Sequence, residues 1–148
     1  MESSKLFEIS AAGMSIERTR VEIAAQNLAN ATTIQTPGAP GYQPQRVVAR
    51  ASPIALATFA ERIEQGLEDG ALGLPQMSVE TTGAAPRVVH DPGHPYADAK
   101  GNVAYPGVDT ATEMVTLMSA LRAYEANVAA MNISRSLVLK TLDIGSGT

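Results

Sequence analysis

The sequence predicts an α+β fold in which long helices at the two ends pair as a coiled-coil-like layer, with a small β-containing module between them. Apolar residues recur every seven positions near the N-terminus, and at alternating steps of three and four near the C-terminus. All nine prolines lie between Pro37 and Pro106, so neither end contains a helix-breaking proline. We therefore expect an N-terminal helix in residues 1–34, a linker and β-containing module in residues 35–107, and a C-terminal helix in residues 108–148.

Two apolar stripes run along the N-terminal helix. They are offset by two positions, which is roughly 200° around a helix, so they occupy nearly opposite faces. A helix that is apolar on two faces needs a neighbour on each, and we expect the C-terminal helix on one side and another subunit on the other. The Phe7 stripe consists of Phe7, Met14, Val21 and Leu28, and the Ile9 stripe consists of Ile9, Ile16 and Ile23.

Asn27 and Asn30 continue the spacing that runs through Ile16 and Ile23, and they place amides where apolar residues are expected. One interpretation is that the helix ends there, because asparagine favours turns and caps over helix interiors. The other is that buried amides fix the register between packed helices, as a single polar core residue does in coiled coils.

The middle region begins with residues 36–42, whose proline and glycine content predicts an irregular linker. Short runs of apolar and β-branched residues between turn signals then predict strands at 46–50, 77–81, 86–90 and 102–105. Residues 55–65 predict a brief helix, because Leu56, Phe59 and Ile63 share one helical face. How the strands pair is left open.

The C-terminal helix carries an apolar seam that extends over more than four heptads. A single helix cannot bury such a seam, so the pattern requires partner helices and indicates a chain that assembles. Only Arg135 interrupts the seam, and its guanidinium either reaches solvent or forms a specific buried pair. The C-terminal seam consists of Met114, Leu117, Leu121, Tyr124, Val128, Met131, Arg135, Val138 and Leu142.

Both ends of this helix have sequence signals. Thr110 and Glu113 have the spacing of a capping box, and Asp109 suits the same positively polarised helix end. Gly145 is predicted as the left-handed residue that follows the last turn.

Composition excludes several classes of protein. The net charge of −4 and pI of about 5.1, without a cluster of basic residues, argue against a nucleic-acid partner. The chain has no cysteine, so it has no disulfide, thiolate metal site or cysteine nucleophile. Polar residues interrupt the N-terminal helix, and no apolar run reaches the roughly 20 residues of a membrane span, so we expect neither a cleaved signal peptide nor a membrane anchor.

Residues 90–98 concentrate both histidines of the chain with two aspartates. Such a set could hold a metal or act in acid–base chemistry, and a metal-assisted hydrolase centred on His90 and His94 is one alternative. The other is a proline-stiffened turn in which Asp91 and Asp98 cap local amides. Zinc sites usually need further ligands at regular spacing, and no phosphate-binding or nucleophile-elbow motif occurs. We therefore expect a protein that is not an enzyme and that has no cofactor or metal.

Several motifs together closely resemble the bacterial flagellar rod, hook and filament axial family. At the termini these are residues 27–31 (NLANA) followed by 41–42 (GY), residues 122–127 (RAYEAN) and residues 142–145 (LDIG). Residues 89–95 (VHDPGHP) and 101–106 (GNVAYP) are similar to the proximal rod members of that family.

This resemblance implies a structural subunit of the proximal rod, part of the hollow drive shaft that transmits torque and lets exported subunits pass. It implies export through the flagellar type III apparatus without a cleaved signal, a periplasmic location in the basal body, and contacts with the rod proteins FlgB, FlgF and FlgG and the base component FliE. The alternatives are another axial subunit or a helical adaptor protein.

The residues expected at the assembly interface are the two N-terminal stripes, the C-terminal seam and five motif residues. Arg122 and Glu125 are three residues apart and could pair on the helix surface. The five motif residues are Asn27, Asn30, Arg122, Glu125 and Asn127.

Overall fold

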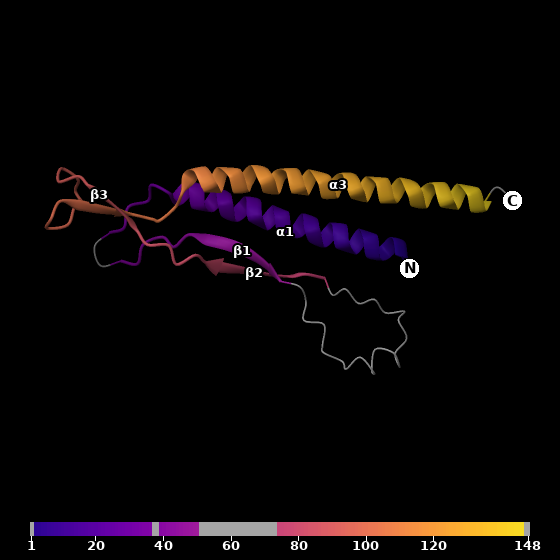
Figure 1. Cartoon of the computed structure of the whole chain (residues 1–148), viewed down its shortest axis with the longest axis horizontal. Helices are drawn as coiled ribbons and strands as arrows, with labels where there is room; N and C mark the ends of the chain where they lie inside the picture. Colours follow the sequence, from indigo (N-terminus) through magenta and orange to yellow (C-terminus); the bar gives the residue numbers. More distant parts are fainter. Residues whose placement is uncertain (1, 37–38, 51–73, 147–148) are drawn as a thin grey trace, which may run out of the picture.

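The computed structural model describes residues 2–36, 39–50 and 74–146, and it confirms the α+β fold (Figure 1). The helix predicted at 55–65 lies outside the described residues. The four predicted strands are confirmed, with ends shifted by at most one residue. In chain order the elements are α1 (Glu2–Asn30), β1 (Gln45–Arg50), β2 (Gln76–Thr81), β3 (Arg87–His90), β4 (Asn102–Tyr105) and α3 (Thr110–Ser146).

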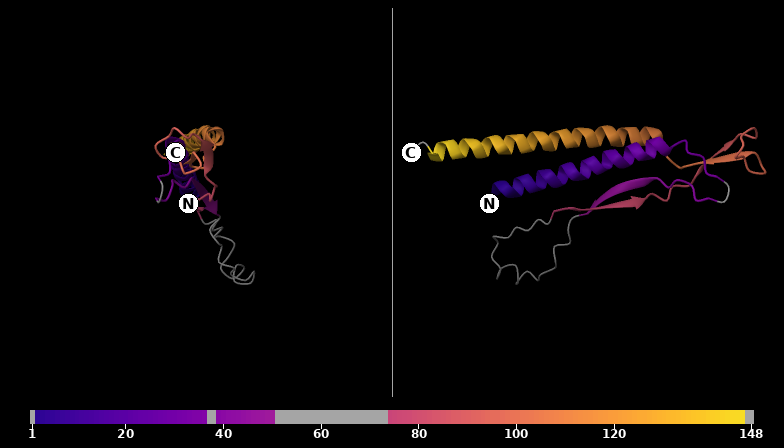
Figure 2. Two further views of the ribbon diagram at one scale, coloured as in Figure 1. Left: turned by 90° about the vertical axis from the view of Figure 1, so that its left-hand side faces the viewer. Right: turned by 180° about the vertical axis from the view of Figure 1, so that it is seen from behind.

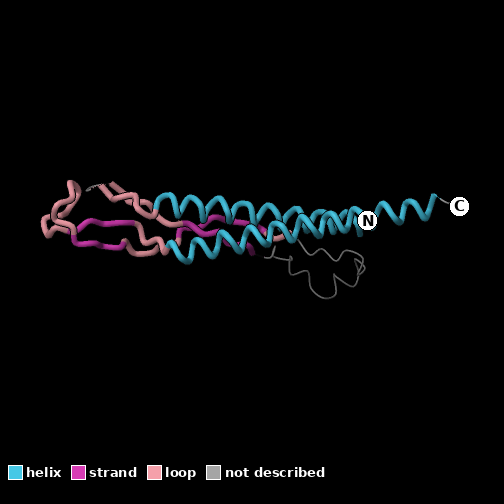
Figure 3. The backbone as a smooth tube through the Cα atoms, turned by 90° about the horizontal axis from the view of Figure 1, so that it is seen from above, coloured by secondary structure: helices cyan, strands magenta, loops and turns pink. Residues whose placement is uncertain are grey.

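The two helices lie side by side and run antiparallel (Figures 1 and 3). Asn27 of α1 contacts Glu113 of α3, and Gly13 of α1 contacts Asn127 of α3. The second contact lies 14 residues earlier in α1 and 14 residues later in α3 than the first, as an antiparallel register requires. Because α1 has 29 residues and α3 has 37, α3 extends beyond the start of α1 (Figure 2).

Small residues form the contact between the helices. Ala24 of α1 and Ala120 of α3 are both buried, and a Cβ atom at Gly13 would lie 2.9 Å from Nδ2 of Asn127. Ala120 is seven residues from both Glu113 and Asn127, so all three lie on one face of α3. Small side chains let two helix backbones approach closely, and this decides which faces meet.

The strands form two separate antiparallel pairs. β1 pairs with β2, with Val47 opposite Val79, and this hairpin lies against α1 (Figure 1). β3 pairs with β4, with Val89 opposite the fully buried Val103, beyond the end at which α1 stops and α3 begins. The segment after α1 is tied to this second pair, because Gln35 N donates to Ala104 O.

The predicted capping box of Thr110 and Glu113 and the predicted helix end at Gly145 are wrong, whereas the expectation that Asp109 suits the start of α3 is confirmed. Asp109 is the N-cap: its Oδ1 accepts from Ala111 N at 3.1 Å, and its Oδ2 accepts from Thr112 Oγ1 at 2.7 Å. The hydrogen bond from the Thr112 side chain, followed by those from backbone amides, lowers the pKa of the Asp109 carboxyl. Glu113 instead directs its carboxylate to Asn27. At the other end α3 continues through Gly145 to Ser146, since glycine disfavours a helix interior by only about 1 kcal/mol.

Candidate assembly interface

Asn27 is the centre of a buried polar network at the end of the helix pair. Its Nδ2 donates to Gln45 O at 2.7 Å and to Glu113 Oε1 at 3.0 Å. Its Oδ1 accepts from Gln45 N at 3.0 Å and from Tyr42 Oη at 2.7 Å. The side chain is 0% exposed, and all four of its hydrogen-bonding positions are used. The structure therefore confirms the interpretation of Asn27 as a buried amide.

Asn30 has the other role. Its Nδ2 donates to Gln26 O at 2.8 Å, and its Oδ1 accepts from Thr33 Oγ1 at 3.2 Å. Both partners lie within four residues along the chain, and α1 ends at Asn30. The helix-ending interpretation thus applies to Asn30. Of the two asparagines in this motif, one is buried between elements and the other ends α1.

The surroundings of Tyr42 keep its phenol hydroxyl protonated, so that it acts as a hydrogen-bond donor. Burial raises its pKa, and the nearby Glu113 carboxylate raises it further. The hydroxyl is therefore protonated near neutral pH and donates to Asn27 Oδ1.

The two stripes of α1 lie on either side of its contact with α3. Gly13 and Ala24, which mark the contact, lie between the stripes, and Asn27 lies on the side of the Ile9 stripe, whose spacing it continues. All stripe residues are half-buried except Ile9, which is exposed. The hairpin covers part of α1 from another side, so α1 has a neighbour from its own chain on more than one face.

The C-terminal seam is divided between the edge of the contact with α1 and the free surface of α3. Leu117, Met131 and Val138 lie within about 60° of the face that carries Glu113, Ala120 and Asn127, whereas Met114 and Leu121 are turned further from it. Within the seam Leu117, Val128, Met131 and Val138 are half-buried, whereas Met114, Leu121, Tyr124, Arg135 and Leu142 are exposed. The half-buried seam residues therefore lie at the edge of the contact with α1, and the exposed ones are left at the surface.

The polar motif residues of α3 are divided between these faces. Asn127 packs against Gly13, inside the helix pair. Arg122 and Glu125 are exposed, and these two described side chains form no ion pair with each other, so the predicted pairing is wrong. Arg135 is also exposed, in agreement with the solvent-facing alternative.

Sequence analysis missed further exposed apolar residues on α3, outside the seam. The search for a seam considered only one heptad repeat and therefore left them out. The sequence does indicate them, because α3 is apolar around most of its circumference, which is typical of helices that are covered on several sides. The missed residues are Val115, Met118, Ile133, Leu137, Leu139 and Ile144.

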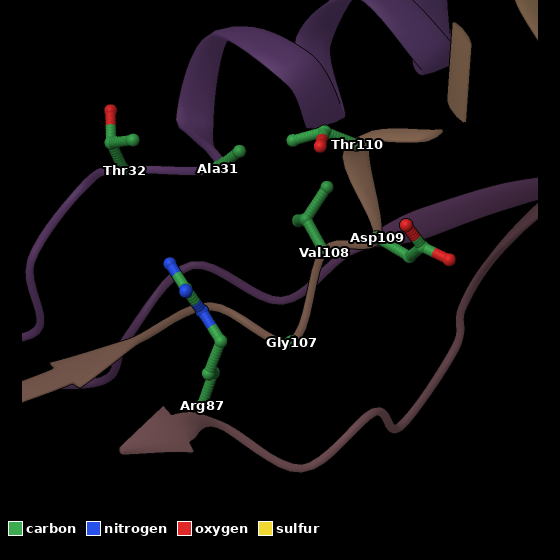
Figure 4. A pocket seen from close by; sticks show the side chains of 7 residues that line it. All are labelled: Ala31, Thr32, Arg87, Gly107, Val108, Asp109 and Thr110. Atoms are coloured by element: carbon green, nitrogen blue, oxygen red, sulfur yellow. The ribbon is translucent and has the colours of Figure 1, made fainter. Parts of the chain in front are cut away.

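An open hollow of about 470 Å³ lies where α1 ends and α3 begins (Figure 4). Ala31, Thr32, Arg87 and residues 107–110 line it. The Arg87 guanidinium lies 5.4 Å from the centre of the Tyr105 ring, in cation–π geometry. The lining supplies one carboxylate, that of Asp109, which is occupied in capping α3. The hollow therefore does not present a paired acid and base.

The histidine-containing turn is organised by local hydrogen bonds. Asp98 Oδ1 accepts from Lys100 N at 2.8 Å and from Asn102 N at 2.9 Å, and these backbone bonds, that from Asn102 foremost, lower the pKa of the Asp98 carboxyl. His94 Nδ1 accepts from Tyr96 N. Within residues 2–36, 39–50 and 74–146 no three His, Cys, Asp or Glu side chains are grouped as metal ligands. The capping interpretation is confirmed for Asp98, whereas Asp91 contributes its carbonyl, which accepts from His94 N.

These features define the class of protein. Two long antiparallel helices expose apolar side chains along one of them, and the helices of the described region include none that is both long and apolar enough to cross a membrane. Residues 99–144 match the family model described as flagellar basal body rod FlgEFG protein C-terminal. The class is that of flagellar basal-body rod proteins.

Full-length relatives define the family. The chain is 36% identical over 140 residues to the flagellar basal-body rod protein FlgC of Yersinia enterocolitica, covering 95% of this chain and 96% of the relative. It is equally identical, with the same coverage, to FlgC of Salmonella typhimurium, and 30% identical over 141 residues to FlgC of Bacillus subtilis, covering 93% and 94% of the two chains. The chain belongs to the FlgC family of flagellar basal-body rod proteins.

Proposed function

We propose that this protein is a structural subunit of the flagellar rod whose helices form the packed wall and whose β-containing residues lie outside it. In this proposal residues 1–34 and 108–148 are the assembly core and residues 35–107 are the peripheral module. Membership of the FlgC family supports the rod assignment. The observation that carries the assembly role is the set of large apolar side chains exposed along α3.

The energetics of these exposed side chains favour association. Burying one Leu, Ile, Val or Met side chain contributes about 1.5–3 kcal/mol. Ten large apolar side chains of α3 are exposed. Enclosing several of them between subunits would offset the cost of about 4–15 kcal/mol for lost translational and rotational freedom.

The finer assignment follows from the same proposal. The subunit lies in the proximal, periplasmic part of the rod, where a tube of packed helices transmits torque and leaves a central channel for exported subunits. It reaches that position through the flagellar type III export apparatus, and its neighbours are FlgB, FlgF, FlgG and FliE. The Phe7 stripe, the Ile9 stripe and the C-terminal seam supply the contacts between subunits.

Replacing exposed apolar residues of α3 tests the assembly role. Met118→Ser combined with Leu121→Ser removes two such side chains without touching the contact with α1. In a strain that lacks the native protein, we expect the double variant to be made and exported but to yield no complete rods in electron micrographs of isolated basal bodies.

Val88→Ser is the matched control, because Val88 is at least as exposed but lies on β3. It should leave rod formation unchanged. Normal rods with the double variant would refute the proposed interface, and loss of rods with Val88→Ser would place the assembly surface elsewhere.

A further inference from the structure

We propose that Asn27 is a single-residue clamp that ties the β1–β2 hairpin to the helix pair, so that hairpin and helices move as one body. Three observations carry the clamp: the direction of the Gln45 backbone groups, the fit of an asparagine amide to four partners, and the scarcity of other polar links. Its mechanical role in a rod rests on the proposed function, whereas the clamp itself is a property of the folded chain.

The backbone polar groups of Gln45 point towards Asn27 because of the strand register. Thr82 N donates to Pro44 O at 2.8 Å, which makes that position a hydrogen-bonded pair of the β1–β2 ladder. Antiparallel ladders alternate, so the N–H and C=O of the next residue, Gln45, point away from β2. Asn27 binds both groups, as a neighbouring strand would, and thereby completes the outer edge of β1 at its first residue.

The four partners of this side chain select asparagine. Gln45 O and Glu113 Oε1 need donors, while Gln45 N–H and the Tyr42 hydroxyl need acceptors. A primary amide offers two donors and one oxygen with two acceptor positions, and this matches the demand completely. Aspartate would offer no donor when ionised, and glutamine would be longer by one methylene. The orientation of the amide is also determined, because the opposite assignment would place its NH₂ group against Gln45 N–H.

Few other polar contacts connect the hairpin with the helices. The remaining side-chain bonds of β1 and β2 stay within the hairpin, as Arg46 and Arg50 both pair with Glu80. In the described parts of the chain, Asn27 supplies every hydrogen bond between β1 or β2 and the two helices. Because it also bonds Glu113, one side chain joins α1, α3 and β1. A load applied to the helices would pass to the hairpin through this point and through the apolar contact of β1 with α1.

Distance measurements on the purified full-length protein test the clamp. The chain has no cysteine, so cysteines introduced at the exposed positions Ala129 and Thr81 carry nitroxide labels on α3 and β2 alone. In the otherwise unchanged protein we expect a narrow distance distribution by pulsed electron paramagnetic resonance. Asn27→Ala should broaden it at least twofold, whereas Asn30→Ala, in the same helix but with local bonds only, should not.

Amide exchange provides the second measurement. With Asn27→Ala, the Gln45 N–H should exchange at least tenfold faster, while the amides of the central β1–β2 pair keep their protection. An unchanged distribution together with unchanged Gln45 exchange would overturn the clamp, as would equal broadening with Asn30→Ala.

Milder variants cover the case in which Asn27→Ala does not fold. Tyr42→Phe and Glu113→Gln each alter one partner and should broaden the distribution to a smaller extent; no change in either would refute the proposal. Both readouts concern the unassembled chain, so failure of the clamp leaves the rod assignment intact, and failure of rod assembly leaves the clamp intact.

Discussion

The two ends of the helix pair are built on different principles. The junction end, where residues 24–31, at and just after the end of α1, meet residues 110–120 of α3, contains Ala24, Asn27, Ala31 and Ala120, all of them buried. The free end, residues 7–10 of α1 and 131–144 of α3, contains no buried residue, and Leu142 and Ile144 are 62% and 77% exposed. The side chains that face α1 at the junction end are buried within one chain, whereas Met114, Val115 and Met118 on its outer side, together with the free end, are left for other molecules to cover.

The difference between the ends follows from the chemistry of their side chains. A buried polar group without a partner costs several kcal/mol, so a network such as that of Asn27 must be satisfied in the folded chain itself. Exposed apolar side chains cost much less in a monomer, and they contribute free energy when another subunit covers them. Substitutions of the buried junction residues should therefore change the stability of the monomer, and those of exposed apolar residues, at the free end or on the outer side of α3, should change association.

The largest loss of stability is expected from Asn27→Asp. This change places a carboxylate beside Gln45 O and Glu113 Oε1 and removes both donors. We expect the free energy of unfolding at pH 7 to fall by more than about 3 kcal/mol, as measured by urea unfolding followed by circular dichroism. Burial and Glu113 would raise the folded-state pKa of the new carboxyl, so the loss should shrink as the pH falls towards about 4.

Asn30→Asp is the control for this variant. Asn30 is only half-buried and bonds locally, so its replacement should cost less than about 1 kcal/mol. Equal losses for the two variants would remove the distinction between Asn27 and an ordinary residue at a helix end.

The next largest effect is expected from Gly107→Ala, also near the junction. A Cβ atom there would overlap Ala85 O and would lie 3.0 Å from Ala84 Cβ. Because the overlapping atom belongs to the backbone, it cannot rotate away, and we expect a loss of about 1–3 kcal/mol in the same unfolding assay. Gly93→Ala should be nearly neutral, since its new Cβ would meet only Asp91 Oδ1, at 3.7 Å. A neutral Gly107→Ala would show that the junction is loosely packed.

A smaller effect is expected midway along the pair, at Gly13. Alanine there should gain about 1 kcal/mol in helix propensity, but its Cβ would meet the amide of Asn127 at 2.9 Å. That amide can turn aside, so Gly13→Ala alone should change stability by less than about 1 kcal/mol. In an Asn127→Ala background the gain should appear in full, with a coupling of about 0.5–1 kcal/mol in a double-mutant cycle. If the effects of the two substitutions on the free energy of unfolding were strictly additive, Gly13 and Asn127 would not be in contact.

The smallest effect on the monomer is expected at the free end. Leu142→Ser combined with Ile144→Ser should change the free energy of unfolding by about 0.5 kcal/mol or less, because both side chains are largely exposed. The same variant should weaken association with other rod subunits, measured by sedimentation of mixtures. A large loss of monomer stability would show that the free end is already packed within the chain.

Local sequence patterns predicted the elements well and the contacts between them less well. The helices and all four strands follow from periodicity and from the distribution of proline, both of which act on neighbouring residues. The pairing of β1 with β2 could not be predicted, because short strands of similar composition fit several partners. The capping box of Thr110 and Glu113 was wrongly predicted because Glu113 has a distant partner, Asn27, which no local pattern reveals.

The sequence by itself determined where helices and strands form, that large apolar surfaces need partners, and that Asn27 would be either a helix end or a buried amide. Only the tertiary structure decided that Asn27 is buried and Asn30 is not, and that small residues form the closest contact between the helices, with only part of the seam beside it. The reason is physical: periodicity reports which side chains are apolar, but backbones approach closest where side chains are smallest, as at Gly13, Ala24 and Ala120. The exposed seam side chains, such as Met114, Leu121 and Leu142, are thereby left at the surface, where another subunit can cover them.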